Sequence, residues 1–336
     1  MCQFRCGDEI DNLILLSGDI MIIKTENLTK QYQKVTSVDF FHRTKQTIAA
    51  VKDVSLQINQ GDHVGLVGLN GSGKSTLIKM ILGILQPNGG KITTFGVNPV
   101  DNRQINARKI GVVFGQRSQL RWDLPVMDTL LLNRELYQVD NKDFHSRLNQ
   151  LTKTLGAEDF LSQPVRTLSL GQRMKAEFIA ALIHDPELII LDEPTIGLDV
   201  LTKNSLIAFL KRLTNKTIIF TSHDLIEVEQ TCSRIMIMNA GNLVLNLDSA
   251  KIANLAVPAT ITFTSSSSSY ADLRQTWPQL MQLTNGDFQL ADIEQKNIKE
   301  ILSQLTASVP IENIEVKNNK LEYLLSRIAG GNAHEI

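Results

Sequence analysis

The sequence has few aromatic residues and no excess of either charge. Aromatic side chains make up 5% of its 336 residues, and 34 Lys and Arg nearly balance 35 Asp and Glu, which leaves a formal net charge of −1. A protein that coats nucleic acid shows a basic excess, and a single-strand binder offers rings on which bases stack. We therefore expect no nucleic-acid partner, whereas the 43% hydrophobic content supports a substantial core.

Cysteine is scarce, and no long apolar run is present. Cys2, Cys6 and Cys232 are an odd number at wide spacing, which indicates reduced thiols in a cytosolic protein. Cys2 and Cys6 lack a second Cys or His pair that would complete a metal site. No apolar run approaches the roughly 20 residues of a membrane-spanning helix, so any action at a membrane is expected to require a partner.

The first twenty residues do not fit a signal peptide, because acidic residues stand close ahead of a very short apolar stretch. Met21 opens MIIKTENLTKQY, which is typical of the first strand of a domain. Residues 1–20 are therefore expected to be a disordered extension or a mis-assigned start.

Short β-branched runs alternate with helical stretches from Met21 to about residue 249, the pattern of a mostly parallel α/β domain. Four runs are nearly all apolar, as expected for strands covered on both faces: residues 63–69, 109–115, 187–194 and 216–223. Residues from about 117 to 184 turn helical and are predicted as an insertion between two strands. Residues 234–247 are predicted to form a hairpin with its turn at residues 240–242.

The composition shifts near residues 250–270, and residues 250–336 are predicted to form a small accessory α+β domain. The serine run at 264–270 is either a linker or the tip of a hairpin. Beyond it, a helix, a strand and a second helix are expected at residues 293–307, 311–319 and 321–331.

A glycine-rich loop carries the clearest chemical signal. GLNGSGKST, residues 68–76, matches G-x-x-x-x-G-K-[ST] between an apolar strand and a helix, the context that supports a phosphate-binding loop over a plain turn. Lys74 would supply charge at the β and γ oxygens, and the Ser75 hydroxyl can ligate Mg²⁺. The nucleotide-binding candidates in this loop are Gly68, Asn70, Gly71, Ser72, Gly73, Lys74, Ser75 and Thr76.

Two acids end the buried run LIILDEP. Asp192 could hold Mg²⁺ and Glu193 could polarise an attacking water, although acids at a strand end often only cap the next turn. Because parallel sheets bind ligands outside the carboxyl ends of their strands, the phosphate loop favours the catalytic interpretation. His223 in TSHD and Asp199 in PTIGLD each have a simpler alternative as helix-start residues, and Gln116 alone would be a surface glutamine.

A second phosphate-binding candidate lies far downstream, in TLSLGQRMKAEF at residues 167–178. Ser169 and Gln172 fit a capping box, and Met174 begins an apolar stripe typical of a helix. Ser169, Gly171 and Gln172 could also hold a phosphate at the helix N-terminus, an interpretation compatible with the capping box.

Together, the phosphate loop, Gln116, LSLGQ, LIILDEP, GLD and TSH occur in the order and approximate spacing of an ABC-type ATPase. Across about residues 21–249 the chain resembles the nucleotide-binding subunit of an ABC transporter. GVVFGQRSQLRWDLPVMDTL and the extended linker between LTKQY and AAVKDVS resemble the exporter-type ATPases that partner with ABC-2 permeases. The resemblance implies a P-loop NTPase (RecA-like) α/β core with an antiparallel β subdomain and a helical insertion, plus the C-terminal α+β domain.

The resemblance also implies roles for single residues and the use of ATP with Mg²⁺. Glu193 would be the catalytic base, His223 the switch histidine, and Gln116 the loop glutamine that senses Mg²⁺ and couples to the helical insertion. Asp199 would lie at a dimer interface. The implied Mg²⁺ ligands are Ser75, Gln116 and Asp192.

In this family the signature segment closes over the γ-phosphate bound to a second cassette, so that two ATPs are sandwiched in a head-to-tail dimer. Ser169 and Gly171 would donate to the partner's phosphate, and a homodimer is the simpler expectation. ATP binding would close the dimer, and the helical insertion with Trp122 would transmit this motion to a separate ABC-2-type permease. The expected function is export of an unidentified substrate, by a cytoplasmic protein held at the inner face of the membrane by its permease.

Two positions depart from the family pattern. Leu170 stands where the signature usually has a glycine. The slot of the adenine-stacking aromatic falls near Lys45, which leaves Tyr32, Phe40, Phe41 or His42 as candidates.

Two alternative functions remain from the residues. A soluble ABC ATPase acting on ribosomes or DNA would carry a second cassette, a coiled coil or a zinc module, and none of these is present. A non-hydrolysing regulatory module is disfavoured by the intact pair Asp192 and Glu193 together with His223.

Overall fold

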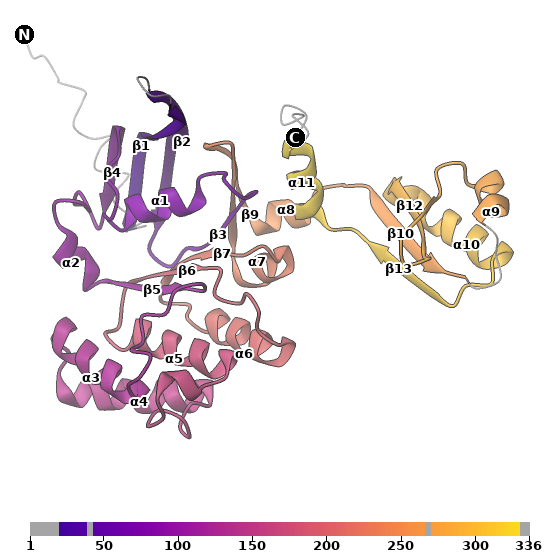
Figure 1. The fold of residues 1–336 in the computed structure, drawn as a ribbon. Helices are drawn as coiled ribbons and strands as arrows, with labels where there is room; N and C mark the ends of the chain where they lie inside the picture. Colours follow the sequence, from indigo (N-terminus) through magenta and orange to yellow (C-terminus); the bar gives the residue numbers. More distant parts are fainter. Residues whose placement is uncertain (1–19, 39–42, 266–269, 330–336) are drawn as a thin grey trace, which may run out of the picture. The chain divides into compact units, whose positions relative to one another are not determined.

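The computed structural model describes residues 20–38, 43–265 and 270–329. The chain divides into two compact units that meet between Asp248 and Ser249, and each unit is described by itself (Figure 1). Within the described ranges, no helix combines the length and the apolar character needed to cross a bilayer.

A six-stranded sheet forms the centre of the first unit, in the order β5-β6-β7-β3-β8-β9. Its strands are β3 His63–Val67, β5 Ile110–Phe114, β6 Leu188–Asp192, β7 Thr217–Thr221, β8 Arg234–Asn239 and β9 Asn242–Asp248. All neighbours run parallel except β8 and β9. The four apolar runs are confirmed as strands, and because they are parallel their carboxyl ends meet at one edge of the sheet.

The predicted hairpin is confirmed as β8 and β9. Its turn consists of Ala240 and Gly241, with φ of 47° and 91°, so Asn242 already belongs to β9. Positive φ at both central residues suits the tight turns whose twist matches that of the flanking strands.

A three-stranded antiparallel sheet, in the order β2-β1-β4, lies beside the first helix (Figure 1). Its strands are β1 Met21–Val38, β2 Arg43–Asn59 and β4 Gly89–Thr94, and the helix is α1 Lys74–Ile81. One hydrophobic core includes side chains of both sheets and of α1, among them Ile23, Ile78 and Ile190. The expected antiparallel β subdomain is therefore present.

The segment between Tyr32 and Ala49, expected to be a linker, is instead a continuation of the β1–β2 hairpin. Backbone pairing continues from Gln31↔Ala49 as far as Val38↔Arg43. Residues 39–42 lie outside the described part. A ladder that pairs backbone groups in both strands needs no apolar pattern, which is why the sequence did not indicate it.

The remaining helices of the first unit are α2 Arg103–Ala107, α3 Val126–Tyr137, α4 Asn141–Leu155, α5 Leu170–Leu182, α6 Val200–Lys211 and α7 Leu225–Thr231, with a 3₁₀ turn, η2, at Val165–Thr167. The helices α3, α4 and α5 lie between β5 and β6 in the chain and form the expected helical insertion (Figure 1). The stripe on α5 is buried, with Met174 and Phe178 at most 2% exposed.

The second unit contains a four-stranded antiparallel sheet in the order β11-β12-β10-β13. Its elements are α8 Ser249–Ala253, β10 Ala259–Thr264, α9 Tyr270–Thr276, β11 Met281–Gln282, β12 Phe288–Ile293, η3 Gln295–Asn297, α10 Ile298–Ser308, β13 Asn313–Lys317 and α11 Lys320–Ala329. From β10 to β13 the order is β-α-β-β-α-β, the ferredoxin-like arrangement. Phe263, Trp277 and Phe288 belong to its core.

Two expectations for this unit are wrong in detail. Ile293 closes β12, so the helix expected from residue 293 begins at Ile298 after a 3₁₀ turn. The serine run lies between the end of β10 at Thr264 and the start of α9 at Tyr270, so the alternative of a hairpin tip is wrong, and the run connects a strand to a helix. Residues 266–269 of that run, and the glycines at 330 and 331, lie outside the described part.

Candidate functional site

The glycine-rich loop connects the end of β3 to the start of α1. Gly68 and Gly73 have φ of 149° and 108°. A Cβ atom on Gly68 would lie 2.2 Å from the carbonyl oxygen of Met238, and one on Gly73 would lie 2.2 Å from that of Ala50. Only glycine allows this close approach, so the loop packs directly on the backbones of β8 and β2.

Lys74 lies folded over this loop. Its ammonium donates to the carbonyl oxygens of Gly68, at 2.6 Å, and Leu69, at 3.3 Å, and the residue is 8% exposed. Burial lowers the pKa of Lys74, and the carboxylates of Glu193 and Asp192 partly offset this effect. Among the described residues the hydrogen bonds of this buried cation go to neutral carbonyl oxygens, an arrangement well suited to an anionic ligand.

Two further features of the loop fit a phosphate group. Ser72 Oγ is buried and has no hydrogen-bond partner within the described residues. The first N–H groups of α1 have no acceptor inside the helix, and α1 has no acidic residue in its first turn. Donors without acceptors beside a buried cation form an anion site.

The two acids lie at the adjoining strand ends. Asp192 ends β6 and is directly paired with Thr221 at the end of β7. The Thr221 hydroxyl donates to Asp192 Oδ1 at 2.7 Å and accepts the backbone N–H of Glu193 at 3.0 Å. Glu193 has φ of 55°, a left-handed conformation that is uncommon outside glycine, and His223 Nε2 lies 2.7 Å from its Oε1.

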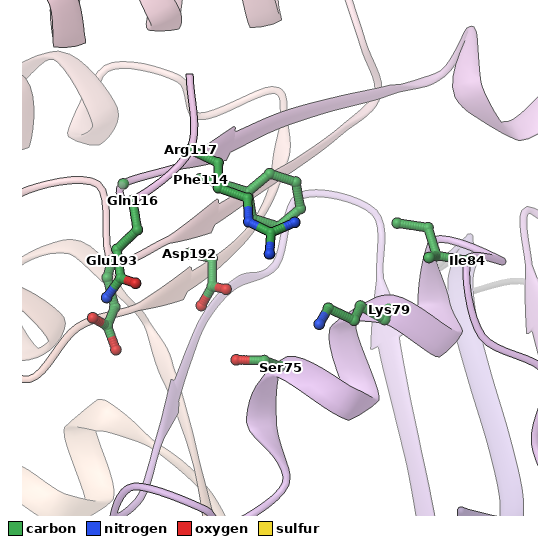
Figure 2. A pocket seen from close by; sticks show the side chains of 9 residues that line it. Ser75, Lys79, Ile84, Phe114, Gln116, Arg117, Asp192 and Glu193 are labelled. Carbon is green, nitrogen blue, oxygen red and sulfur yellow. The ribbon is translucent and has the colours of Figure 1, made fainter. Parts of the chain in front are cut away.

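A cavity of about 330 Å³ opens between these elements. Its lining residues are Ser75, Lys79, Ile84, Phe114, Gly115, Gln116, Arg117, Asp192 and Glu193. Figure 2 shows Ser75 on α1 and Asp192, Glu193 and Gln116 at the strand ends, all lining this cavity. The structure thus brings together the predicted residues of the phosphate loop, the glutamine loop and the acid pair.

Three residues of this region were missed by sequence reasoning. Lys79 follows Ser75 by one helical turn on α1, so helical spacing could have placed it at the cavity. Arg117 follows Gln116 directly and carried no motif of its own. Thr221 precedes the TSHD histidine, but its bond to Asp192 depends on the register of β6 with β7.

The signature residues lie elsewhere, because Ser169, Gly171 and Gln172 do not line this cavity. The capping box at the start of α5 is confirmed: Ser169 Oγ accepts the Gln172 N–H at 3.2 Å, and Gln172 Oε1 accepts the Ser169 N–H at 2.9 Å. The helix N-terminus and its dipole are therefore presented with a fixed geometry.

Asp199 also lies away from the cavity and caps α6, where its Oδ1 accepts the N–H of Thr202 at 2.9 Å. The starts of α5 and α6 are neighbours, because a Cβ atom on Gly171 would lie 3.0 Å from Thr202 Oγ1. A Cβ atom on Gly197 would likewise lie 3.2 Å from the side chain of Leu170. The segments that carry Ser169 and Asp199 therefore form one continuous surface.

No partner for adenine is established by these contacts. Tyr32 is 40% exposed on β1, with Lys30 Nζ 5.7 Å from its ring centroid. Phe40, Phe41 and His42 lie outside the described residues, and the position of Lys45 is known only as a backbone pair of Val35. The choice of stacking residue stays a prediction.

Comparison with known proteins decides the family. A family profile for the ABC transporter domain matches residues 51–196. The ABC transporter ATP-binding protein NatA of Bacillus subtilis is 35% identical over 206 residues, which cover 61% of this chain and 84% of NatA. This chain belongs to the ABC transporter ATP-binding proteins. The bacitracin transport ATP-binding protein BcrA of Bacillus licheniformis is 33% identical over 225 residues, covering 66% of this chain and 68% of BcrA.

Solved structures of ABC cassettes support the same conclusion. The dimeric ATP-binding cassette MJ0796, in a post-hydrolysis state bound to ADP and Pi, matches with a TM-score of 0.58 at 26% identity, over 68% of this chain and 99% of that one. The predicted family and the P-loop α/β fold are confirmed. As a member of this family, the ABC protein described here binds and hydrolyses ATP.

Proposed function

We propose that the cavity beside Ser75 holds the triphosphate of ATP and that Glu193 acts as the catalytic base. The observation that carries this proposal is the 2.7 Å contact of His223 Nε2 with Glu193 Oε1, at the edge of a cavity that also receives Asp192 and Ser75. A carboxylate oriented by a histidine can accept a proton from an attacking water. In this proposal His223 holds Glu193 in position and contacts the γ-phosphate, while Lys74 and the loop N–H groups bind the phosphate oxygens.

The residues present also fit Mg²⁺. A hydroxyl, an amide and a carboxylate, from Ser75, Gln116 and Asp192, supply the oxygen ligands that this ion prefers. Mg²⁺ is commonly held by one or two carboxylates together with substrate phosphates, so a single carboxylate in this set suits it. When bound, Mg²⁺ would neutralise charge that develops on the phosphate oxygens.

The start of α5 is proposed to serve a second subunit. Ser169, Gly171 and Gln172 lie away from their own chain's cavity, yet they form a capped helix N-terminus suited to an anion. In a head-to-tail dimer they would donate to the phosphate held by the partner subunit's loop, and Asp199 would lie at the same interface. Leu170 and Leu201, 37% and 82% exposed, provide apolar surface there.

Light scattering of the Glu193→Gln variant tests both proposals. Loss of the base should trap bound ATP, so the mass is expected to shift from monomer to dimer on addition of Mg-ATP. The exposed Glu158→Gln variant, a matched control, should hydrolyse ATP like the parent protein. A Glu193→Gln protein that binds ATP but stays monomeric would contradict the composite site, in which the start of α5 of one subunit binds the phosphate held by the other.

We also propose that this ABC protein powers export through a separate ABC-2-type permease. Relatives include the linearmycin resistance ATP-binding protein LnrL of Bacillus subtilis and the Nod factor export ATP-binding protein I of Rhizobium leguminosarum. The helical insertion carries exposed apolar side chains suited to a membrane partner: Trp122, Leu124, Leu131, Leu132 and Leu136. The protein would then lie at the cytoplasmic face of the membrane, with residues 250–336 as an accessory domain.

Cell fractionation tests the permease proposal. The protein is expected to sediment with membranes, and the Leu136→Asp variant, which changes a 63% exposed side chain, should shift to the supernatant while it retains ATPase activity. Ile105→Asp, at a 59% exposed position on α2, is the matched control and should remain with the membranes. Equal sedimentation of both variants would contradict docking at the helical insertion.

A further inference from the structure

A buried carboxylate joins the loop after β5 that carries Gln116, here the glutamine loop, to α5, here the signature helix. Glu177 lies in the middle of α5 and is 3% exposed. Its Oε1 accepts the hydroxyl of Ser118 at 2.5 Å and the N–H of Gln119 at 3.2 Å, and its Oε2 lies 3.3 Å from the same N–H. Within the described part of the chain, no lysine or arginine is paired with this carboxylate.

The same loop is held at a second point. The side-chain amide of Gln119 donates to the carbonyl oxygen of Glu177 at 3.2 Å and lies 3.4 Å from that of Val112 in β5. The Ser118 hydroxyl in turn accepts the N–H of Leu120 at 3.1 Å. The loop after β5 is thus fastened to one residue of α5 by both its backbone and its side chains.

Glu177 lies between two parts of the proposed dimer site: Gln116 at the cavity of its own chain, and the start of α5, which is proposed to face the second subunit. Gln116, two residues before Ser118, lines the cavity that is proposed to hold the ATP of the same chain. Ser169 begins the same helix, about two turns or 12 Å before Glu177. A helix is rigid over this length, so a displacement of the loop at Ser118 would move the capped N-terminus as well.

Burial of this carboxylate is unfavourable by itself. Burial raises the pKa of Glu177, and the donors Ser118 and Gln119 counter this effect. Its chain neighbours Ala176 and Phe178 are fully buried and apolar. An apolar residue at position 177 would therefore pack in the same way without the cost of removing a carboxylate from water. The packing of the helix therefore does not require a carboxylate at this position, whereas the hydrogen bonds to Ser118 and Gln119 do.

We propose that Glu177 is a positioning residue that couples the Gln116 loop to the signature helix, so that ATP in one site sets the position of Ser169 toward the ATP of the second subunit. The proposal rests on the composite dimer proposed above. It makes the two sites communicate in both directions, because a coupling between binding sites is reciprocal.

The test compares Glu177→Gln, Ser118→Ala and their double variant with the parent protein. In the parent, the Hill coefficient of ATP hydrolysis is expected to exceed 1. In Glu177→Gln it should fall to 1 and kcat should fall at least tenfold, while the Kd of a fluorescent ATP analogue for the monomer stays within twofold. Ser118→Ala should show the same effects more weakly, and the double variant should be no worse than Glu177→Gln.

Ser118 is exposed, so Ser118→Ala keeps the test decisive even where Glu177→Gln fails to fold. Unchanged kcat and Hill coefficient in Ser118→Ala would overturn the proposal. A fall in Tm and in monomer affinity that parallels the fall in kcat would also overturn it, because a structural role alone would then suffice. Absence of ATP-dependent dimers in the Glu193→Gln protein with Glu177 intact would overturn the composite dimer itself; dimers that form there but are lost with Glu177→Gln would support the coupling.

Discussion

His223 and Glu193 meet at 2.7 Å at the ends of neighbouring strands, β7 and β6. Glu193 takes a left-handed backbone conformation, and its N–H is bonded to Thr221, the residue that ends β7. A backbone outlier retained at this point is consistent with a catalytic role for Glu193.

From the His223–Glu193 contact we expect substitution of either residue to lower kcat but to leave the affinity for ATP nearly unchanged. Glu193→Gln should lower kcat by about 10² to 10⁴, the usual contribution of a general base, and His223→Ala should lower it as well, because the carboxylate loses its orienting partner. ATP affinity should change little in either case. Steady-state hydrolysis and equilibrium binding of ATP measure the two effects. A His223→Ala protein with parental kcat would contradict the assignment.

We expect replacement of Lys74 to raise the thermal stability of the ATP-free protein and to weaken its binding of ATP. Lys74→Met should raise the Tm of the ATP-free protein, because the folded state lowers the pKa of this lysine and so disfavours its charge. It should weaken ATP binding by about 10- to 100-fold through loss of a charge-assisted contact. Differential scanning fluorimetry with and without ATP checks both. The exposed Lys211→Met variant serves as the control and should change neither quantity.

His184 predicts loss of stability in mild acid. Burial lowers its pKa from 6.5 to about 4, its Nε2 is bonded to the Ile110 carbonyl oxygen at 3.2 Å, and its buried Nδ1 has no hydrogen-bond partner among the residues that the structure describes. The ring stacks on Tyr137 with the two ring centroids 3.9 Å apart, so protonation would bury a charge and an unpaired N–H. Because the folded pKa is the lower one, this stability is fully present above pH 6.5 and is lost as the pH falls toward 4.

Urea unfolding at several pH values measures this effect. Between pH 7.5 and pH 5, His184 should account for a loss of about 2 kcal/mol in the free energy of unfolding. His184→Phe keeps a ring to stack on Tyr137 but has no proton to bind, so its stability should depend less on pH. His145→Gln, at an exposed position, should leave the pH dependence as it is. An identical slope for His184→Phe and the parent would contradict the assignment.

We expect the substitution Glu227→Gln to lower the free energy of unfolding strongly, although it replaces only the carboxylate by an amide. Its Oε2 accepts the hydroxyls of Thr195 at 2.6 Å and Ser222 at 2.7 Å, and its Oε1 lies 2.7 Å from Lys203 Nζ. The residue is 4% exposed. Glu227→Gln would therefore leave Lys203 without one of its carboxylate partners and would replace an acceptor of two hydroxyl groups by an amide. The free energy of unfolding should fall by about 3 kcal/mol.

Chemical denaturation of Glu227→Gln beside Glu187→Gln checks this magnitude. Glu187 is paired with Lys109 at 3.1 Å, but both side chains are more than 40% exposed. Exposed pairs contribute about 0–1 kcal/mol, so the control should lose little stability. Comparable losses in the two variants would show that burial of the Glu227 network carries no special weight.

Much of the first unit was predictable from local patterns. The four apolar strands, the β8–β9 hairpin and the capping box at Ser169 are confirmed because each depends on residues close together in the chain. The phosphate loop was equally clear, since Gly68 and Gly73 occupy conformations that other residues rarely adopt.

The buried acid Glu177 was not predicted, although it lies inside a segment singled out for its motif. A single acid on an amphipathic helix is usually exposed, and its burial depends on a loop that begins some sixty residues earlier. The extension of the β1–β2 hairpin was missed for a similar reason, because its backbone pairing leaves no mark on side-chain periodicity.

The sequence by itself determined the order of strands and helices, the glycine-rich loop proposed to bind phosphate and the family to which the chain belongs, because local spacing and backbone preference encode these. Tertiary structure decided which side chains meet. Asp192 reaches Thr221 through the register of two parallel strands, and the signature helix starts away from its own chain's cavity. Such contacts join residues far apart in the chain, and only the packing of the sheet and its helices sets their distances.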